Sequence, residues 1–202
     1  NGSLNPGVYA KDIILHVIGK FGTNGFTDQA VIFTGDAILK LTNDEKMTIS
    51  NMMIEMGAMI GYIDQGSESI GEVARTYNID AKSIEPCVAC PSSPGNVKPV
   101  EMVEGVKINQ AVLGSCTNGR YSDMVIASEV LKDRKVANGV NLIVVPGSKR
   151  IAEKMDKNGL TKIFRDSGAI VTNPGCGPCF GAHQGLLNFD DVAVSSTNRN
   201  FP

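Results

Sequence analysis

The chain has 202 residues, of which 42% are hydrophobic and 20% charged, and its formal net charge at pH 7 is −2. This near balance of charge predicts no nucleic-acid partner, and because no apolar run approaches the roughly 18 residues that span a bilayer, we expect no membrane partner either. Residues 1–6 are polar and contain no signal-peptide core, so we expect a cytoplasmic protein.

Helix and strand patterns alternate in the first part of the chain. Apolar residues recur at helical spacing from Ile13 to Phe21, and Thr42 with Glu45 forms a capping box, a pairing that begins many helices. We expect helices over residues 8–21, 42–61 and 69–76 and a strand over residues 29–34. This alternation is typical of an α/β layer.

Residues 86–106 differ in character, because four prolines and several small polar residues interrupt any periodicity. We interpret this stretch as an extended connection between one α/β domain over residues 1–85 and another over residues 107–202. In the second domain we expect strands over residues 111–113, 142–145, 170–171 and 192–194, and helices over residues 121–132, 148–158 and 160–166. Strands that alternate with helices predict a mainly parallel sheet.

Five cysteines, at positions 87, 90, 116, 176 and 179, are the first candidates for a functional site. An odd number without a secretion signal argues against a disulfide framework, so metal binding or catalysis is the better starting hypothesis. Cys87 and Cys90, taken with Cys176 and Cys179, imitate a zinc ribbon. However, the 85 residues between Cys90 and Cys176 far exceed the roughly 15–20 of that motif. We therefore interpret Cys87 and Cys90 as incidental.

The segment Gly114–Arg120, Gly-Ser-Cys-Thr-Asn-Gly-Arg, lies directly between a predicted strand and a predicted helix. That position is the carboxyl end of a strand, where α/β folds build their sites, and its Ser, Thr and Asn side chains supply hydrogen bonds near the sulfur of Cys116. A buried cysteine in a tight turn is the alternative for this motif alone.

A second motif, over residues 173–181, contains Cys176 and Cys179 within Gly-Cys-Gly-Pro-Cys. Two cysteines with two residues between them can bind one metal centre, and the glycines and prolines favour a tight loop that directs backbone amides at sulfur. A thioredoxin-like redox pair is the rival interpretation. It requires a longer helix after its first cysteine than residues 181–185 allow.

A third motif, Ser-Thr-Asn-Arg-Asn-Phe over residues 196–201, follows a predicted strand. Arginine binds carboxylates through two parallel hydrogen bonds, so Arg199 is a candidate for substrate binding, and the neighbouring Asn198 can orient it. Most arginines after strands are simply solvated, which is the alternative for this motif by itself.

Taken in order, Gly-Ser-Cys-Thr-Asn, Gly-Cys-Gly-Pro-Cys and Asn-Arg-Asn-Phe resemble the signature of the aconitase superfamily. Residues 10–15 and 51–58 are also similar to that family's second domain, so the resemblance covers nearly the whole chain. It implies that residues 1–85 are this second domain and that residues 107–202 are part of the cluster-binding third domain. The Gly119-Arg120 variant and the compact blocks are most similar to the large subunits of 3-isopropylmalate dehydratase and homoaconitase. The resemblance implies an α/β fold with aconitase-like three-layer α/β/α domains and mainly parallel sheets.

The resemblance also implies a 4Fe–4S cluster held by three cysteines, which here are Cys116, Cys176 and Cys179. In the family one iron has no protein ligand and acts as a Lewis acid on the substrate hydroxyl. The implied activity is that of a hydro-lyase, a carbon–oxygen lyase that reversibly dehydrates a hydroxy-dicarboxylic or tricarboxylic acid. For the dehydratase this reaction belongs to leucine biosynthesis.

Four other residues acquire roles from the resemblance. Glu55 matches a glutamate that hydrogen-bonds the iron-bound water or hydroxyl and can act as acid or base, and Asn51 plays a supporting part near the cofactor. Asn198 matches an asparagine beside the cluster, and Arg199 matches an arginine that binds a substrate carboxylate. Taken alone, Glu55 is more simply explained as a glutamate on a helix surface.

The family's first domain is missing ahead of Asn1, and its swivel domain is a separate small subunit in isopropylmalate dehydratases. We therefore expect these residues to be a fragment that is inactive alone and that has a small-subunit partner and a small-molecule hydroxy acid as substrate. Large subunits of homoaconitase and 2,3-dimethylmalate dehydratase are alternatives. A cluster-free RNA-binding module and a structural zinc module are alternatives of a different class, which the charge balance and the cysteine spacing disfavour.

Overall fold

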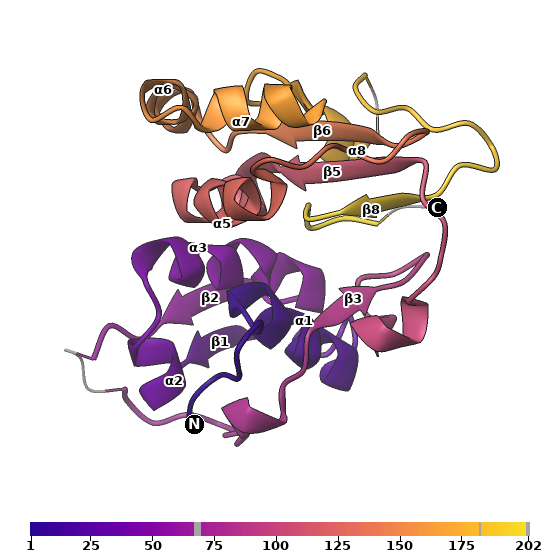
Figure 1. The fold of residues 1–202 in the computed structure, drawn as a ribbon. Helices are drawn as coiled ribbons and strands as arrows, with labels where there is room; N and C mark the ends of the chain where they lie inside the picture. Colours follow the sequence, from indigo (N-terminus) through magenta and orange to yellow (C-terminus); the bar gives the residue numbers. More distant parts are fainter. Residues whose placement is uncertain (67–69, 182, 201–202) are drawn as a thin grey trace. The chain divides into compact units, whose positions relative to one another are not determined.

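A computed structural model describes residues 1–66, 70–181 and 183–200, and the chain divides into two compact units (Figure 1). Unit 1 comprises Asn1–Glu104 and Asn200–Pro202, and unit 2 comprises Gly105–Arg199. Each unit has its own apolar core. The finer division, with a separate connection over residues 86–106, stays a prediction. Within the described residues, no helix has both the length and the apolar character that crossing a membrane requires.

Unit 1 contains a parallel pair of strands, β1 (Ala30–Phe33) and β2 (Ile60–Ile63). Its helices are α1 (Ala10–Phe21), α2 (Asp36–Leu39) and α3 (Asn43–Met52), with the 3-10 turns η1 (Met53–Met56) and η2 (Ala81–Ser83). The predicted capping box begins α3, since Thr42 Oγ1 accepts a hydrogen bond from Glu45 N at 3.3 Å and Thr42 N donates to Glu45 Oε2 at 2.8 Å.

The core of unit 1 lies between α1 and α3. Ile14 of α1, Ile49 of α3 and Met56 of η1 are fully buried in one apolar cluster. Burying an aliphatic side chain of this size stabilises the fold by about 2 kcal/mol. Ile49 and Met56 of the α3–η1 segment face this core, whereas Asn51 and Glu55 of the same segment are partly exposed.

Two predicted elements of unit 1 were wrong. The helix expected to reach Gly61 ends at Met56, because Gly57 takes the left-handed conformation with φ 84° and its N–H donates to the Ile54 carbonyl. Glycine adopts this conformation without a Cβ clash, which ends the helix and lets β2 begin. Residues 70–76 form no helix, and residue 69 lies outside the described residues.

The proline-rich segment forms more structure than the predicted extended connection. β3 (Cys87–Ala89) pairs antiparallel with β4 (Val97–Pro99), and the 3-10 turn η3 (Val100–Val103) follows. Cys87, Ala89 and Val97 pack against the core of unit 1. This pair of strands could not be predicted from composition, because each strand has only three residues.

In its described part, unit 2 contains a fully parallel sheet in the order β7–β6–β5–β8. Its strands are β5 (Gln110–Gly114), β6 (Asn141–Val145), β7 (Ile170–Val171) and β8 (Ala193–Ser195). β6 pairs with β5, and β7 pairs with β6, so these strands follow one another in one direction across the sheet. The chain then crosses back, and β8 pairs with the other side of β5. The direction of building therefore reverses between β5 and β8, which makes this a topological switch point.

The main helices of unit 2 are α5 (Tyr121–Leu131), α6 (Lys149–Lys157) and α7 (Leu160–Ser167), and they share one core cluster (Figure 1). Phe164 of α7 is buried in it with Leu142 and Val144, alternate residues of β6 that point to one face of the sheet. Ile143 and Val145, on the opposite face, are buried too. Strands buried on both faces are typical of parallel sheets, and the predicted α/β class with mainly parallel sheets is confirmed.

Candidate functional site

The three predicted motifs of unit 2 follow strands of the same sheet. Cys116 lies in the short helix α4 (Ser115–Asn118), directly after β5. Asn198 and Arg199 follow β8, the neighbouring strand, and the Gly-Cys-Gly-Pro-Cys motif comes after β7. Parallel strands end at the same edge of a sheet, so two motifs flank the switch point, where α/β folds bind ligands.

The turn that presents Cys116 depends on a close approach of two backbones. Gly114 has φ 122°, and a Cβ there would overlap the carbonyl oxygen of Val145 on β6. Gly114 N also donates to Ser196 Oγ at 2.8 Å, which ties together the ends of β5 and β8. Ser115 has φ 67°, an uncommon conformation for a residue with a side chain. The chain therefore turns sharply just before Cys116.

Asn198 joins two cysteine motifs through its side-chain oxygen. Thr117 Oγ1 donates to Asn198 Oδ1 at 3.2 Å, and Cys179 Sγ donates to the same oxygen at 3.5 Å. Thr117 Oγ1 also lies 4.0 Å from Cys116 Sγ. A line of polar contacts, which we call the Cys116–Cys179 contact line, therefore runs from Cys116 through Thr117 and Asn198 to Cys179. Arg199 is exposed directly after Asn198.

Cys176 and Cys179 lie on a single helical turn, α8 (Gly177–Phe180), with Cys176 as its N-cap. A Cβ on residue 177 would lie 2.6 Å from His183 Cε1, so the imidazole lies directly against Gly177 and would have to shift if residue 177 carried a side chain. The closeness of His183 to Cys179 in the sequence is the sole hint of this packing.

Two supporting polar residues escaped prediction from the sequence. Gln110, buried on β5, donates from Nε2 to the Gly185 carbonyl at 2.8 Å and so fastens the segment after α8 to the sheet. Ser196 supports Gly114 as described above. For Gln110 the only signal is a polar residue beside an apolar strand pattern, and for Ser196 there is none beyond its place in the third motif.

The donor set suits an iron–sulfur cluster. Cys116 and Cys176 are exposed and Cys179 is half-buried, while Ser115 Oγ, buried beside Cys116, has no hydrogen-bond partner among the described residues. In the same part of the chain, no three His, Cys, Asp or Glu side chains stand close enough to hold a single metal ion. Cysteine thiolates are the protein ligands that iron–sulfur clusters take, so the three cysteines match such a cluster in residue type.

Cys87, in unit 1, has a setting that is poorly suited to metal binding. Its backbone N–H donates to Asp12 Oδ1 at 2.9 Å, and its thiol donates to the Asp12 carbonyl at 3.9 Å. Burial, and then the negative charge of Asp12, raise the pKa of the Cys87 thiol from its ordinary value of 9.0 to about 12. The same burial and charge disfavour the thiolate form that metal ligands require.

The raised pKa of Cys87 predicts a pH-dependent stability difference. The unfolded thiol loses its proton near pH 9 and the folded thiol only near pH 12, so the contribution of this neutral thiol is fully present below about pH 9 and is lost as pH rises toward 12. We expect the free energy of unfolding of the wild-type chain, minus that of Cys87→Ala, to stay constant up to about pH 9 and then to fall. Urea titrations across this range measure it. All other groups titrate equally in both proteins, so their contributions cancel. If the difference in free energy of unfolding does not change with pH, the burial argument is wrong.

Asn51 and Glu55 belong to unit 1 and are both half-buried. Asn51 lies in the last turn of α3, and Glu55 lies in η1 directly after it. A carboxamide and a carboxylate therefore lie four residues apart on either side of the change from α-helix to 3-10 turn.

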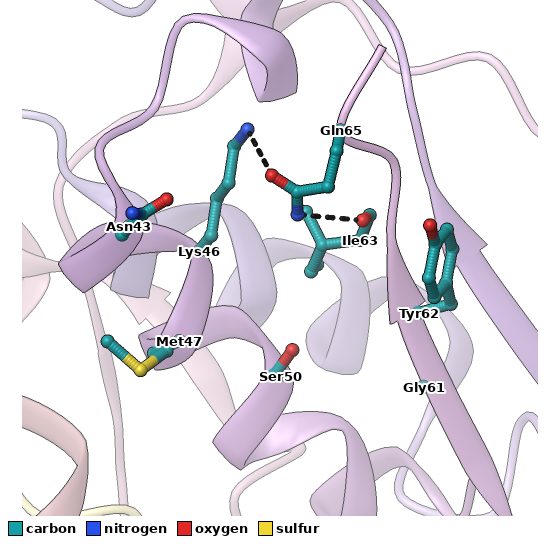
Figure 2. A pocket seen from close by; sticks show the side chains of 8 residues that line it. All are labelled: Asn43, Lys46, Met47, Ser50, Gly61, Tyr62, Ile63 and Gln65. Carbon is teal, nitrogen blue, oxygen red and sulfur yellow. Dashed lines mark hydrogen bonds between the residues drawn. The ribbon is translucent and has the colours of Figure 1, made fainter. Parts of the chain in front are cut away.

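A separate open hollow of about 400 Å³ lies beside β2 in unit 1 (Figure 2). Lys46 Nζ donates across it to Gln65 Oε1 at 3.3 Å, and Gln65 Nε2 donates to the Ile63 carbonyl at 3.0 Å. The other lining residues are Asn43, Met47, Ser50, Gly61 and Tyr62. None of the predicted site residues lines this hollow.

The sequence matches the aconitase family (aconitate hydratase) over residues 1–71 and 98–202. It is 46% identical, over 96% of its length and 50% of the relative's, to the probable methanogen homoaconitase large subunit of Methanothermobacter thermautotrophicus. It is 41% identical to the probable 3-isopropylmalate dehydratase large subunit of the same organism, over 99% of this chain and 52% of that one. The 3-isopropylmalate dehydratase large subunit of Clostridium kluyveri is also 41% identical, over 100% and 52%. The chain thus spans about half the length of the curated relatives it matches.

The matched ranges contain all the predicted site residues. Asn51 and Glu55 lie in the first range, and the three cysteines predicted as ligands lie with Asn198 and Arg199 in the second. Cys87 and Cys90 fall between the two ranges. Because the match covers most of the sequence and includes the motifs at the switch point, the chain belongs to the aconitase family.

Proposed function

We propose that this chain is the cluster-binding part of a hydro-lyase that acts like 3-isopropylmalate dehydratase, removing water reversibly from a hydroxy-dicarboxylic or tricarboxylic acid. The observation that carries the proposal is the Cys116–Cys179 contact line at the switch point. It joins two of the three proposed thiol ligands to the asparagine that the family pattern associates with its cofactor. Two relatives named above are 3-isopropylmalate dehydratase large subunits, which supports this choice of reaction.

In this proposal, Cys116, Cys176 and Cys179 would hold a 4Fe–4S cluster. When bound, the cluster supplies a Lewis-acidic iron for the hydroxyl group that leaves. The exposure of Cys116 and Cys176 puts this chemistry within reach of a small acid from solvent. Cys87 is left out of this ligand set, because it contacts Asp12 and lies between the two ranges that match the family.

The other proposed residues bind substrate, orient groups and move a proton. The exposed guanidinium of Arg199 binds a substrate carboxylate through paired N–H donors. Asn198 and Asn51 offer carboxamide N–H donors to the cofactor. The Glu55 carboxylate takes up or returns a proton at its oxygen as water is added or removed.

We further propose a small, swivel-domain subunit as partner, because the relatives named above are themselves large subunits. The chain spans about half of the length of these relatives. The proposed setting is leucine biosynthesis in the cytoplasm.

Homoaconitase is the second candidate function. A specific observation favours it: the relative at 46% identity is named as a probable methanogen homoaconitase large subunit. The cluster chemistry is the same in both candidates. The difference lies in the acid that is bound, so the test must compare acids.

The proposal is tested by anaerobic reconstitution of the chain with iron and sulfide, followed by EPR spectroscopy of the reduced cluster. We expect iron and acid-labile sulfide in equal amounts, and a spectrum that changes when a hydroxy acid coordinates the open iron. 3-Isopropylmalate and homocitrate are compared, with succinate as the control because it has no hydroxyl group. The acid that changes the spectrum at the lower concentration decides between dehydratase and homoaconitase.

Three results would contradict this function. Bound zinc without sulfide would favour a structural zinc module. If no hydroxy acid changes the EPR spectrum of the reduced cluster, the hydro-lyase assignment is wrong. Retention of RNA at moderate salt by a chain that takes up no cluster would favour an RNA-binding module.

A further inference from the structure

We propose that Arg120 is a specificity-determining residue that binds a second carboxylate of the acid, beside the carboxylate proposed for Arg199. The inference rests on the proposed function in one respect, namely that the ligand is an acid with at least two carboxylates. Every contact that supports it lies within unit 2.

The guanidinium of Arg120 contains a hydrogen-bond donor that no acceptor of the chain satisfies. Its Nε is buried and has no hydrogen-bond partner among the described residues. In the same part of the chain the guanidinium forms no ion pair with a carboxylate. A buried donor without an acceptor is costly, and a charged one more so. The side chain as a whole is only half-buried, so an acid from solvent can reach it.

Unsatisfied polar atoms gather in the short segment that contains Arg120. Within the part of the chain that the structure describes, four buried side-chain N or O atoms have no partner, and three of them are Ser115 Oγ, Asn118 Oδ1 and Arg120 Nε. Protein interiors leave few such atoms, so their concentration in residues 115–120 calls for a partner from outside the chain. A carboxylate supplies the acceptor that suits the Arg120 Nε–H.

The acidic side chain nearest to Arg120 in the sequence has another role. Asp123 Oδ2 accepts a hydrogen bond from the backbone N of Arg120 at 3.0 Å, and Asp123 Oδ1 accepts one from Asn118 Nδ2 at 3.4 Å. Asp123 therefore holds the backbone at the start of α5 and the Asn118 amide. An acceptor for the Arg120 guanidinium has to come from elsewhere.

The backbone on both sides of the Arg120 side chain is fixed. Gly119 O accepts from Gly147 N at 2.8 Å, and a Cβ on residue 119 would lie 2.7 Å from that nitrogen. Arg120 O accepts from Met124 N at 3.1 Å, within the first turn of α5. The guanidinium is therefore carried by a backbone that needs no ordering when a ligand binds, which favours affinity.

Arg120 and Arg199 follow neighbouring strands at the same edge of the sheet. Arg120 comes after β5 and Arg199 after β8, and these strands pair in parallel. The two segments are joined by a hydrogen bond from Thr117 Oγ1 to Asn198 Oδ1 at 3.2 Å. Two arginines at one edge offer paired N–H donors to two carboxylates. We therefore expect this site to prefer an acid with two carboxylates over an acid with one.

The test follows the Nε–H resonances of the ¹⁵N-arginine-labelled chain, without metal and at constant ionic strength, as succinate or propionate is added. The Arg120 and Arg199 resonances are identified by their loss in Arg120→Gln and Arg199→Gln. Succinate has two carboxylates and propionate has one. We expect succinate to shift both resonances at the same concentration, about tenfold lower than propionate requires, the effect of one additional charge-assisted hydrogen-bonded pair.

The variant Arg120→Gln tests the preference itself. We expect its affinity for succinate to fall about tenfold, to that for propionate, because only one carboxylate can then be paired. Arg134→Gln is the matched control: it removes the same charge from unit 2, but Arg134 is exposed beyond the last residue of α5, and we expect it to bind succinate as the wild type does. Circular dichroism checks that each variant is folded.

Three results would overturn the inference. If succinate leaves the Arg120 resonance unmoved, a water molecule satisfies Nε and no carboxylate binds there. If Arg120→Gln weakens succinate and propionate equally, or if Arg134→Gln weakens succinate as much as Arg120→Gln does, the effect is one of general charge or structure. None of these readouts needs a cluster, so the role of Arg120 is decided even if the chain takes up no iron and sulfide, a result that would contradict only the proposed function.

Discussion

Replacing Cys116 by alanine is expected to lower the iron and sulfide bound after reconstitution to less than about a tenth of the wild-type amount, because the cluster is held only through its thiolates. Cys176 and Cys179 share one helical turn, α8, whereas Cys116 comes from the separate turn after β5. Without Cys116, the remaining two ligands would hold the cluster from one side only. Colorimetric iron and sulfide assays, with the visible spectrum, measure the loss.

Cys90→Ala is the matched control for this experiment. Cys90 is partly buried and, like Cys116, forms no disulfide, but it lies between the two ranges that match the family. We expect this variant to bind iron and sulfide as the wild type does. Loss of metal from Cys90→Ala together with retention in Cys116→Ala would instead assign the metal to the cysteine pair of unit 1.

Gly114→Ala is expected to destabilise unit 2 by about 3 kcal/mol or more, since it combines backbone strain with overpacking. Gly114 has φ 122°, a region that residues with a Cβ rarely adopt, and the added methyl would overlap the Val145 carbonyl oxygen. Relief of the overlap requires β5 and β6 to separate, although their pairing runs through this residue. Urea unfolding followed by circular dichroism measures the loss of stability.

Gly139→Ala separates the two contributions. Gly139 also has a positive φ, 83°, but no atom lies within 4 Å of the position that its Cβ would take. We expect a cost of about 1 kcal/mol from backbone strain alone. Equal destabilisation by both substitutions would show that the close approach to Val145 does not matter for stability.

Most elements of unit 2 were predictable because their signals are local. The helix predicted over residues 121–132 is α5 (Tyr121–Leu131), and the strand predicted over residues 142–145 is β6 (Asn141–Val145). Apolar periodicity and capping depend on neighbours within one or two turns, so the sequence displays them directly. In unit 1, β2 was missed because its four residues follow η1 after a gap of only three, with no change in composition.

The candidate site, too, was only partly predictable from the sequence. The sequence predicted the tight turns that present Cys116, Cys176 and Cys179, and its resemblance to the aconitase superfamily implied the cluster that these cysteines would bind. The order of the strands was not predictable, and it places β8 beside β5 so that Asn198 meets Thr117, 81 residues earlier in the chain.

The motifs and the short-range turns of this protein can be established from its sequence, because each depends on residues a few positions apart. The pairing of Asn198 with Thr117, and the burial of Cys87 against Asp12, 75 residues earlier, were decided by the tertiary structure. Contacts at such separations follow from which strands and helices pack together, and that choice depends on the core as a whole rather than on any local pattern.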